Sequence, residues 1–107
     1  MDNSYIHNLW QSIVLKLNSK TEIQTVRLDG NEGVWFSAYS INGYVEIKPF
    51  SNPKNPRKIV EKEFTKVYPC YQLWKAGKIL RKSMRKISLN TSYILALINH
   101  FEKESPK

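Results

Sequence analysis

The sequence predicts an α+β domain: an N-terminal helix, a three-stranded antiparallel β-meander, then three C-terminal helices. Three observations give this order. Apolar residues recur at helical spacing at both ends of the chain, short alternating segments lie between them, and an Asn-Gly pair separates two of these segments. A chain of 107 residues has the length of one domain with one core. We expect a single globular domain over residues 1–103 and a frayed tail over 104–107.

The first predicted element is a helix from about Ser4 to Leu17. Its expected buried face combines residues at helical spacing, namely Ile6, Trp10, Ile13 and Leu17, and Asp2, Asn3 or Ser4 can serve as N-cap. An extended segment from Ile23 to Leu28 follows, and residues 29–33 have the composition of a turn.

A β-hairpin is predicted next, with strands over 34–41 and 44–49 joined by Asn42 and Gly43. Both central residues of a type I′ turn need positive φ, which Asn-Gly adopts readily. This turn pairs Ile41 with Tyr44 and sets which residues share a face. We expect one face in the core, made of Val34, Phe36, Ala38, Val45 and Ile47. The opposite face carries Trp35, Tyr39 and Tyr44, and the N-terminal helix is available to cover it.

Three helices are expected in the C-terminal half. The first begins at Arg57 or Lys58, after a proline-containing loop, and ends near Gly77. Its apolar stripe is Val60, Phe64, Val67, Tyr71 and Trp74. A short helix over 79–87 turns Leu80, Met84 and Ile87 inward. After the connection 88–90, a helix over 91–101 has Asn90 as N-cap and turns Ile94, Leu97, Ile98 and Phe101 inward.

Positive charge is concentrated in one part of the chain. Residues 54–86 contain eleven Lys or Arg and two Glu, whereas the remainder has six basic and seven acidic residues. Five basic residues fall opposite the apolar side of the short helix, namely Lys78, Arg81, Lys82, Arg85 and Lys86. No acid lies among these five residues, so their like charges repel one another, and this repulsion favours a surface that binds an external anion. The alternative interpretation is an ordinary solvated helix face.

The two last helices and the turn between them resemble winged-helix or helix-turn-helix DNA-binding domains, most clearly over 58–101, with the hairpin as a wing-like element. The resemblance implies that the second helix enters the major groove of double-stranded DNA while the preceding helix contacts phosphates. The expected phosphate contacts are Arg57, Lys58, Lys78, Arg81, Lys82, Arg85 and Lys86. The expected contacts from the second helix and its start are Asn90, Thr91, Ser92, Asn99 and Lys103. The outer stripe of this helix is expected to be Ser92, Ala96, Asn99 and Lys103.

Two other binding interpretations stay open. The basic face also suits an acidic protein, which would make the chain an interaction or inhibitor module like small phage-type or immunity-type proteins. The outward aromatics Trp35, Tyr39 and Tyr44 suit stacking of single-stranded nucleic acid or a homodimer contact. Nucleic acid, DNA more than RNA, is the expected partner.

The sequence predicts no enzyme. The tripeptide from Glu46 to Lys48 resembles part of the PD-(D/E)xK nuclease core, but the best second carboxylate, Asp29, belongs at the far end of the neighbouring strand, on the order of 15 Å away. His7 and His100 have no acid at ligand spacing, so no metal or cofactor is expected.

The sequence also predicts a cytoplasmic protein without a membrane partner. Cys70 is the only cysteine, which excludes an internal disulfide and favours a reducing compartment. The polar, acidic N-terminus lacks signal-peptide character, and no apolar run approaches the ~20 residues of a membrane span.

Overall fold

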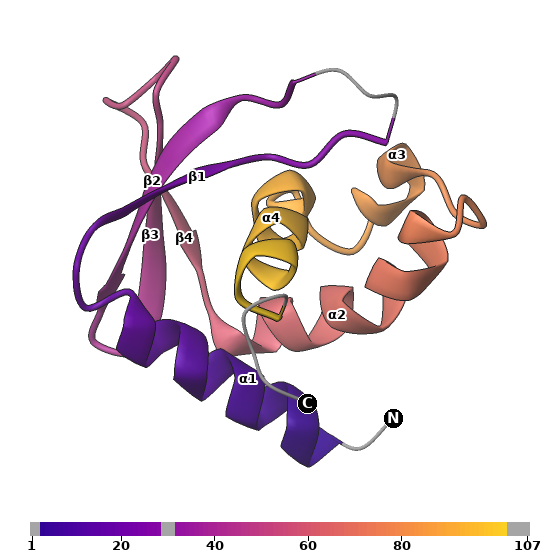
Figure 1. Cartoon of the computed structure of the whole chain (residues 1–107), viewed down its shortest axis with the longest axis horizontal. Coiled ribbons are helices and arrows are strands. Elements are labelled where there is room, and N and C mark those ends of the chain that lie inside the picture. Colours follow the sequence, from indigo (N-terminus) through magenta and orange to yellow (C-terminus); the bar gives the residue numbers. More distant parts are fainter. Residues whose placement is uncertain (1–2, 29–31, 103–107) are drawn as a thin grey trace.

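The computed structural model describes residues 3–28 and 32–102, and these form two layers (Figure 1). One layer is a four-stranded antiparallel sheet in the order β1-β2-β3-β4. Its strands are β1 (Thr21–Gln24), β2 (Trp35–Ile41), β3 (Tyr44–Pro49) and β4 (Arg57–Ile59). The helices are α1 (Asn3–Lys16), α2 (Glu61–Lys75), the one-turn α3 (Arg81–Met84) and α4 (Thr91–Glu102). The α+β class and the N-terminal helix are confirmed.

The N-terminal helix α1 packs as its apolar periodicity predicts. Ile6, Trp10, Ile13 and Leu17 are all buried, and the Trp10 ring lies 5.1 Å from the ring of Phe64 in α2. Because α1 lies beside α2 on the helical side of the sheet (Figure 1), it does not cover the opposite face. Among the described residues, no helix packs on the outward sheet face, where Trp35 and Tyr39 are exposed.

The hairpin is confirmed in turn type and register. Asn42 and Gly43 have φ values of 48° and 86°, and Ile41 pairs with Tyr44. Phe36, Ala38, Val45 and Ile47 are buried as expected. Val34, however, is 57% exposed, because β2 begins one residue later and Val34 belongs to the connection from β1. The predicted extended segment over 23–28 is shifted, since β1 ends at Gln24.

The fourth strand corrects the predicted helix start at Arg57 or Lys58. These residues lie in β4, where Arg57 pairs with Ile47 and Lys58 with Glu46 of β3. Three residues cannot display a strand pattern, so pairing with the free edge of β3 determines their conformation. Val60 then becomes the N-cap of α2 and is 40% exposed, outside the core stripe to which the sequence assigned it.

Helix α2 ends where the sequence predicts. Phe64, Val67, Tyr71 and Trp74 are buried along its inner stripe, and the helix continues through Pro69. Gly77 has a φ of 75°. The N–H of Gly77 donates to the Trp74 carbonyl at 3.0 Å and the N–H of Lys78 to the Leu73 carbonyl at 2.8 Å, the two bonds of a Schellman cap.

The predicted short basic helix over 79–87 is reduced to the single turn α3. Met84 is buried, but Leu80 and Ile87 are 62% and 39% exposed, so these two do not form an apolar side. An isolated short helix is unstable without packing, and the like charges along this segment repel one another. Lys78, Arg81, Lys82, Arg85 and Lys86 therefore do not share one helix face.

Helix α4 lies in the middle of the helical layer (Figure 1), in contact with α1, α2 and β1. Its predicted inward residues are buried, but Leu95 and Ala96 are each only 1% exposed as well. The prediction that Ala96 lies on an outer stripe is wrong, because the uninterrupted apolar run over 94–98 is buried on all sides. The tail 104–107, Lys103 and part of the predicted turn at 29–33 lie outside the described residues.

Candidate functional site

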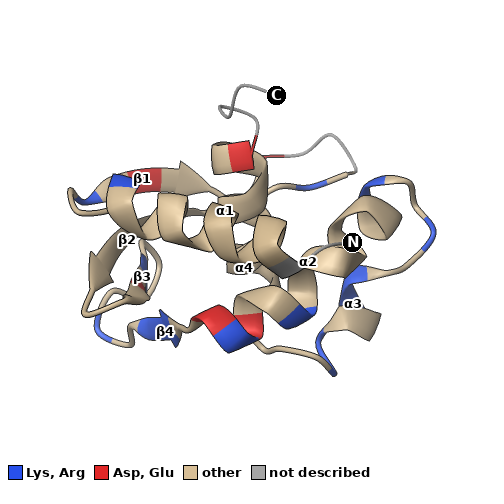
Figure 2. Ribbon diagram, turned by 90° about the horizontal axis from the view of Figure 1, so that it is seen from below, with Lys and Arg blue, Asp and Glu red and all other residues tan. Residues whose placement is uncertain are grey.

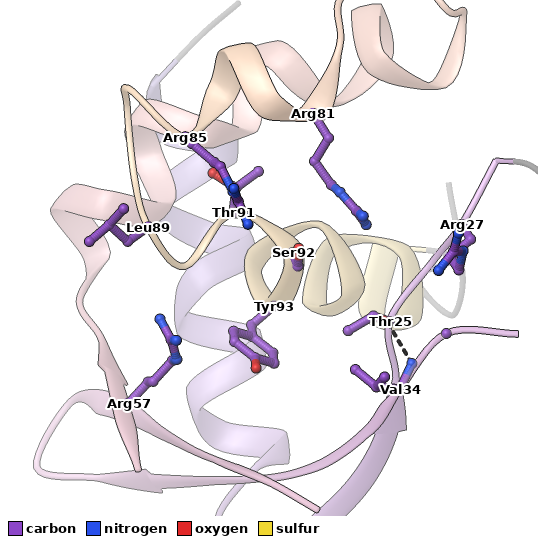
Figure 3. A pocket seen from close by; sticks show the side chains of 11 residues that line it. Thr25, Arg27, Val34, Arg57, Arg81, Arg85, Leu89, Thr91, Ser92 and Tyr93 are labelled. Atoms are coloured by element: carbon purple, nitrogen blue, oxygen red, sulfur yellow. Dashed lines mark hydrogen bonds between the residues drawn. The ribbon is translucent and has the colours of Figure 1, made fainter. Parts of the chain in front are cut away.

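Four arginines surround one cavity of about 210 Å³ beside the first turn of α4 (Figure 3). Arg27 comes from the connection after β1, Arg57 from β4, Arg81 from α3, and Arg85 from the residue that follows α3. The rest of the lining is Thr25, Gly33, Val34, Leu89, Thr91, Ser92 and Tyr93. None of the described residues that line this cavity, which we call the arginine cavity, is acidic.

The arginine cavity contains every arginine of the chain. The sequence has four arginines and thirteen lysines, and all four arginines line the cavity whereas none of the described lysines does. Arg has a planar guanidinium that binds two oxygens of one anion at once, whereas Lys presents a single mobile ammonium. The cavity therefore has the chemistry of an oxyanion site, beyond what positive charge alone provides.

The connection between β1 and β2 shapes the wall that includes Arg27. The N–H of Thr25 donates to the Val34 carbonyl at 2.9 Å. The N–H of Val34 donates in turn to Thr25 Oγ1, also at 2.9 Å (dashed line in Figure 3). The Gln24 side chain donates to the Gly33 carbonyl at 3.0 Å. These bonds extend the strand pairing beyond β1 and fix the backbone on both sides of the wall.

Arg57 is oriented by a polar network at the opposite wall. Its Nη1 donates to Asn90 Oδ1 at 3.3 Å, and Asn90 Nδ2 donates to Glu63 Oε2 at 3.1 Å and to the Lys58 carbonyl at 3.3 Å. Ser88 Oγ also donates to Glu63. The sequence assigned Asn90 to nucleic-acid contact, but its side chain links β4 to α2 and positions Arg57.

The other residues predicted to read a groove are dispersed. Thr91 is 1% exposed, and its hydroxyl donates to the Ser88 carbonyl at 2.6 Å and the Met84 carbonyl at 3.2 Å. Ser92 is half-buried and lines the arginine cavity (Figure 3). Asn99 accepts from the Tyr71 hydroxyl at 3.2 Å, farther along α4. Within this set, Ser92 is thus the residue best placed to contribute a hydroxyl to a ligand in the cavity.

The predicted phosphate-contact residues divide into two groups. Arg57, Arg81 and Arg85 line the cavity, while Lys78, Lys82 and Lys86 are exposed outside it. Figure 2 shows Lys and Arg positions, in blue, at α3 and on the connections beside it. Lys58 belongs to the outer sheet face, where its Nζ lies 4.3 Å from the Tyr44 ring centroid.

Arg27 is the one cavity arginine that the sequence did not predict as a site residue. It is the single basic residue between Lys20 and Lys48, so no local run of charge points to it. The four-to-thirteen ratio of Arg to Lys is the only signal available in the sequence. Even that ratio becomes informative only when the fold brings the four arginines together.

The open face of the sheet is a different kind of surface. Trp35 and Tyr39 are 46% and 42% exposed, and Tyr44 is half-buried beneath Lys58. A hollow of about 190 Å³ on this face is lined by Lys20, Ser37, Tyr39, Glu46 and Lys48. Lys48 and Glu46 are 3.7 Å apart. Mixed charge makes this face less selective for anions, and its use for stacking or dimer formation stays a prediction.

The titratable groups with perturbed pKa values gather around Glu102, at the other end of α4 from the cavity. Burial and a hydrogen bond to Glu102 raise the pKa of Tyr68, and burial with a 2.8 Å bond to the same carboxylate raises the pKa of Tyr5. Glu102 ends α4, whereas the cavity lies at the beginning of that helix. Over residues 3–28 and 32–102, no group of three or more His, Cys, Asp or Glu could hold a metal.

The described helices are all too short or too polar to cross a lipid bilayer. The feature that separates this chain from a generally basic surface is thus the collection of its arginines in one cavity. Comparison with known proteins adds nothing to this geometry: no family model, curated protein or solved structure matches the chain.

Proposed function

We propose that this protein is a non-enzymatic nucleic-acid-binding module that recognises the phosphate backbone through the arginine cavity. The observation that carries the proposal is the convergence of Arg27, Arg57, Arg81 and Arg85 on one cavity whose described lining residues include no acid. Like charges that share one small cavity repel one another, and the repulsion grows as the local dielectric constant falls. A bound anion converts this repulsion into attraction.

Surrounding charge supports a polyanion as the ligand. The segment that contains Arg81 and Arg85 also contains three exposed lysines, namely Lys78, Lys82 and Lys86. Exposed lysines attract a charged backbone over about a Debye length, roughly 8–10 Å at physiological salt, without needing fixed geometry. The lysines thus extend the electrostatic footprint, and the arginines supply oriented contacts at its centre.

The mode of binding follows from the burial of α4. Leu95, Ala96 and Leu97 lie in the core, so this helix cannot enter a major groove without unfolding the domain. Affinity is therefore assigned to phosphate contacts, which carry no sequence information directly. We expect duplex DNA to bind with little sequence preference and with Kd values on the order of 1–100 µM at physiological salt.

The test is fluorescence anisotropy with labelled duplex and single-stranded DNA and RNA over a series of salt concentrations. If about six phosphates are neutralised, the slope of log K against log salt should be near −5 for duplex DNA and near −4 for a single strand. The double substitution Arg81→Glu/Arg85→Glu should weaken binding roughly tenfold or more.

A matched control separates the cavity from net charge. Lys62 and Lys66 are exposed residues of α2 that do not line the cavity, so Lys62→Glu/Lys66→Glu changes the net charge equally. This variant should bind within roughly threefold of the parent. Equal losses in the two variants, or a salt-independent affinity, would overturn the proposal. The absence of binding to any nucleic acid would also overturn it and would favour an acidic protein partner.

A further inference from the structure

We infer that the arginine cavity holds the terminal phosphate monoester of a nucleic-acid strand, an inference that rests on the proposed nucleic-acid-binding function. Its first support is the number of guanidinium groups on one small cavity. An internal phosphodiester carries one negative charge, whereas a phosphate monoester carries about 1.5 to 2 and presents three strong acceptor oxygens. Four arginines match the monoester better in both charge and donor number.

The size of the cavity gives the second support. Its volume of about 210 Å³ lies below the ~300–1,000 Å³ of sites that enclose a whole small molecule. A cavity of this size suits the insertion of one charged group whose remainder stays outside. A strand end can insert in this way, whereas an internal phosphate has nucleosides attached on both sides.

The rim of the cavity gives the third support. Val34 and Leu89 line it and are 57% and 79% exposed, so apolar side chains stand next to the guanidinium groups. The Tyr93 ring also lines the cavity, and the Arg57 guanidinium lies 5.6 Å from its centroid. Apolar rim contacts suit the terminal sugar and base, while the arginines and the Ser92 hydroxyl suit the phosphate oxygens.

The use of Arg rather than Lys at these four positions is the most specific feature. Lysines supply the same charge, and the chain uses them at its other basic positions, yet the basic residues among the described lining of the cavity are all arginines. The planar fork matches two oxygens of one phosphate, so Arg-to-Lys replacement keeps the charge and removes the bidentate geometry. This difference allows recognition of a terminal phosphate to be separated from general attraction to DNA.

The experiment compares three forms of one duplex of about 20 base pairs: linear with 5′-phosphates, linear with 5′-hydroxyls, and closed by a hairpin loop at each end. The full chain should bind the phosphorylated duplex roughly tenfold or more tighter than the other two forms. In Arg81→Lys/Arg85→Lys this preference should fall to within about twofold, while affinity for the hydroxyl duplex changes by less than about threefold. Each of Arg81→Lys and Arg85→Lys alone should lose part of the preference, which preserves the comparison if the double variant unfolds.

The control Lys62→Arg/Lys66→Arg, at exposed residues of α2 that do not line the cavity, should leave the preference for the phosphorylated end unchanged. Equal affinity for all three duplexes would overturn this inference while leaving nucleic-acid binding in place, and no binding to any of them would overturn both. Competition distinguishes the source of the phosphate group. A nucleoside monophosphate, inorganic phosphate or phosphopeptide that binds as tightly as the phosphorylated duplex would show that the cavity does not select a strand end, and would likewise overturn the inference.

Discussion

Replacing Gly33 by alanine tests whether the connection between β1 and β2 is as closely packed as the structure indicates. A Cβ atom at Gly33 would lie 1.9 Å from the Thr25 carbonyl oxygen and 2.4 Å from Thr25 Oγ1. Ordinary van der Waals contact begins at 3.4 Å, so the backbone would have to separate by about 1.5 Å. No rotation of a side chain relieves a contact with a carbonyl group.

The expected cost follows from what that separation would disrupt. Thr25 and Val34 exchange two hydrogen bonds of 2.9 Å beside Gly33, each contributing about 0.5–1.5 kcal/mol. Added to an overpacking cost of about 1–3 kcal/mol, their loss should lower the free energy of unfolding by roughly 2–6 kcal/mol. For a domain of this size the Tm should fall by about 10 °C or more.

The measurement is urea and thermal unfolding followed by circular dichroism, with Gly43→Ala as the matched control. Gly43 has a φ of 86°, but a Cβ atom at this position would have no neighbouring atom within 4 Å. Replacing Gly43 by alanine should lower the free energy of unfolding by about 1–2 kcal/mol, because the positive φ alone is unfavourable for alanine. Gly33→Ala should therefore be the more destabilising variant. If the free energy of unfolding of Gly33→Ala equalled or exceeded that of Gly43→Ala, the close approach of Gly33 to Thr25 would be refuted.

Three further predictions address α4, the Arg57 network and the tyrosine pair. Ala96→Arg should prevent folding, as measured by circular dichroism, because Ala96 is only 1% exposed. The control Gln72→Arg, on the exposed side of α2, should fold normally, and a stably folded Ala96→Arg protein would contradict the central position of α4. Asn90→Ala should reduce stability by about 1–2 kcal/mol and weaken DNA binding, since Arg57 and Glu63 both lose a partner; unchanged anisotropy and Tm would argue against the network. The pKa of Tyr68 is raised by burial and by Glu102, so its contribution to stability should be full below the unfolded-state pKa of about 10 and decline as the pH rises above that value. Tyr68→Phe should flatten this alkaline decline in urea titrations over a pH series, and an equally steep decline in the variant would contradict the role of Tyr68.

The parts of the fold that local residues determine were predictable. Apolar spacing in α1, the Asn42-Gly43 turn and the Gly77 cap each depend on a few neighbouring residues, and each appears as expected. The fourth strand was not predictable, because Arg57–Ile59 becomes a strand by pairing with β3. The single turn α3 likewise depends on how little of its segment is buried.

The candidate site was predictable in charge but not in geometry. Three of the four cavity arginines lie in the basic segment 54–86, while Arg27 belongs to a distant connection. Helical periodicity placed the basic residues on one helix face, which the structure replaces with a short turn and loops. The burial of Ala96 had a visible signal, because the run Ile94–Ile98 is apolar without interruption, and such a run indicates a helix buried on all sides.

The arginines and the lysines are expected to contribute to nucleic-acid binding in two different ways, which the net charge alone does not distinguish. The lysines lie on several surfaces, including α2, the α3 region and the outer sheet face, and such dispersed charge changes mainly the rate and salt dependence of association. The arginines share one cavity, where a planar guanidinium that binds two oxygens at once affects how long a bound phosphate remains. Lysine substitutions should therefore alter association rates, whereas Arg-to-Lys changes in the cavity should alter dissociation rates at constant charge. Stopped-flow kinetics distinguishes the two effects, and identical kinetic changes in both groups of variants would show that the cavity acts through charge alone.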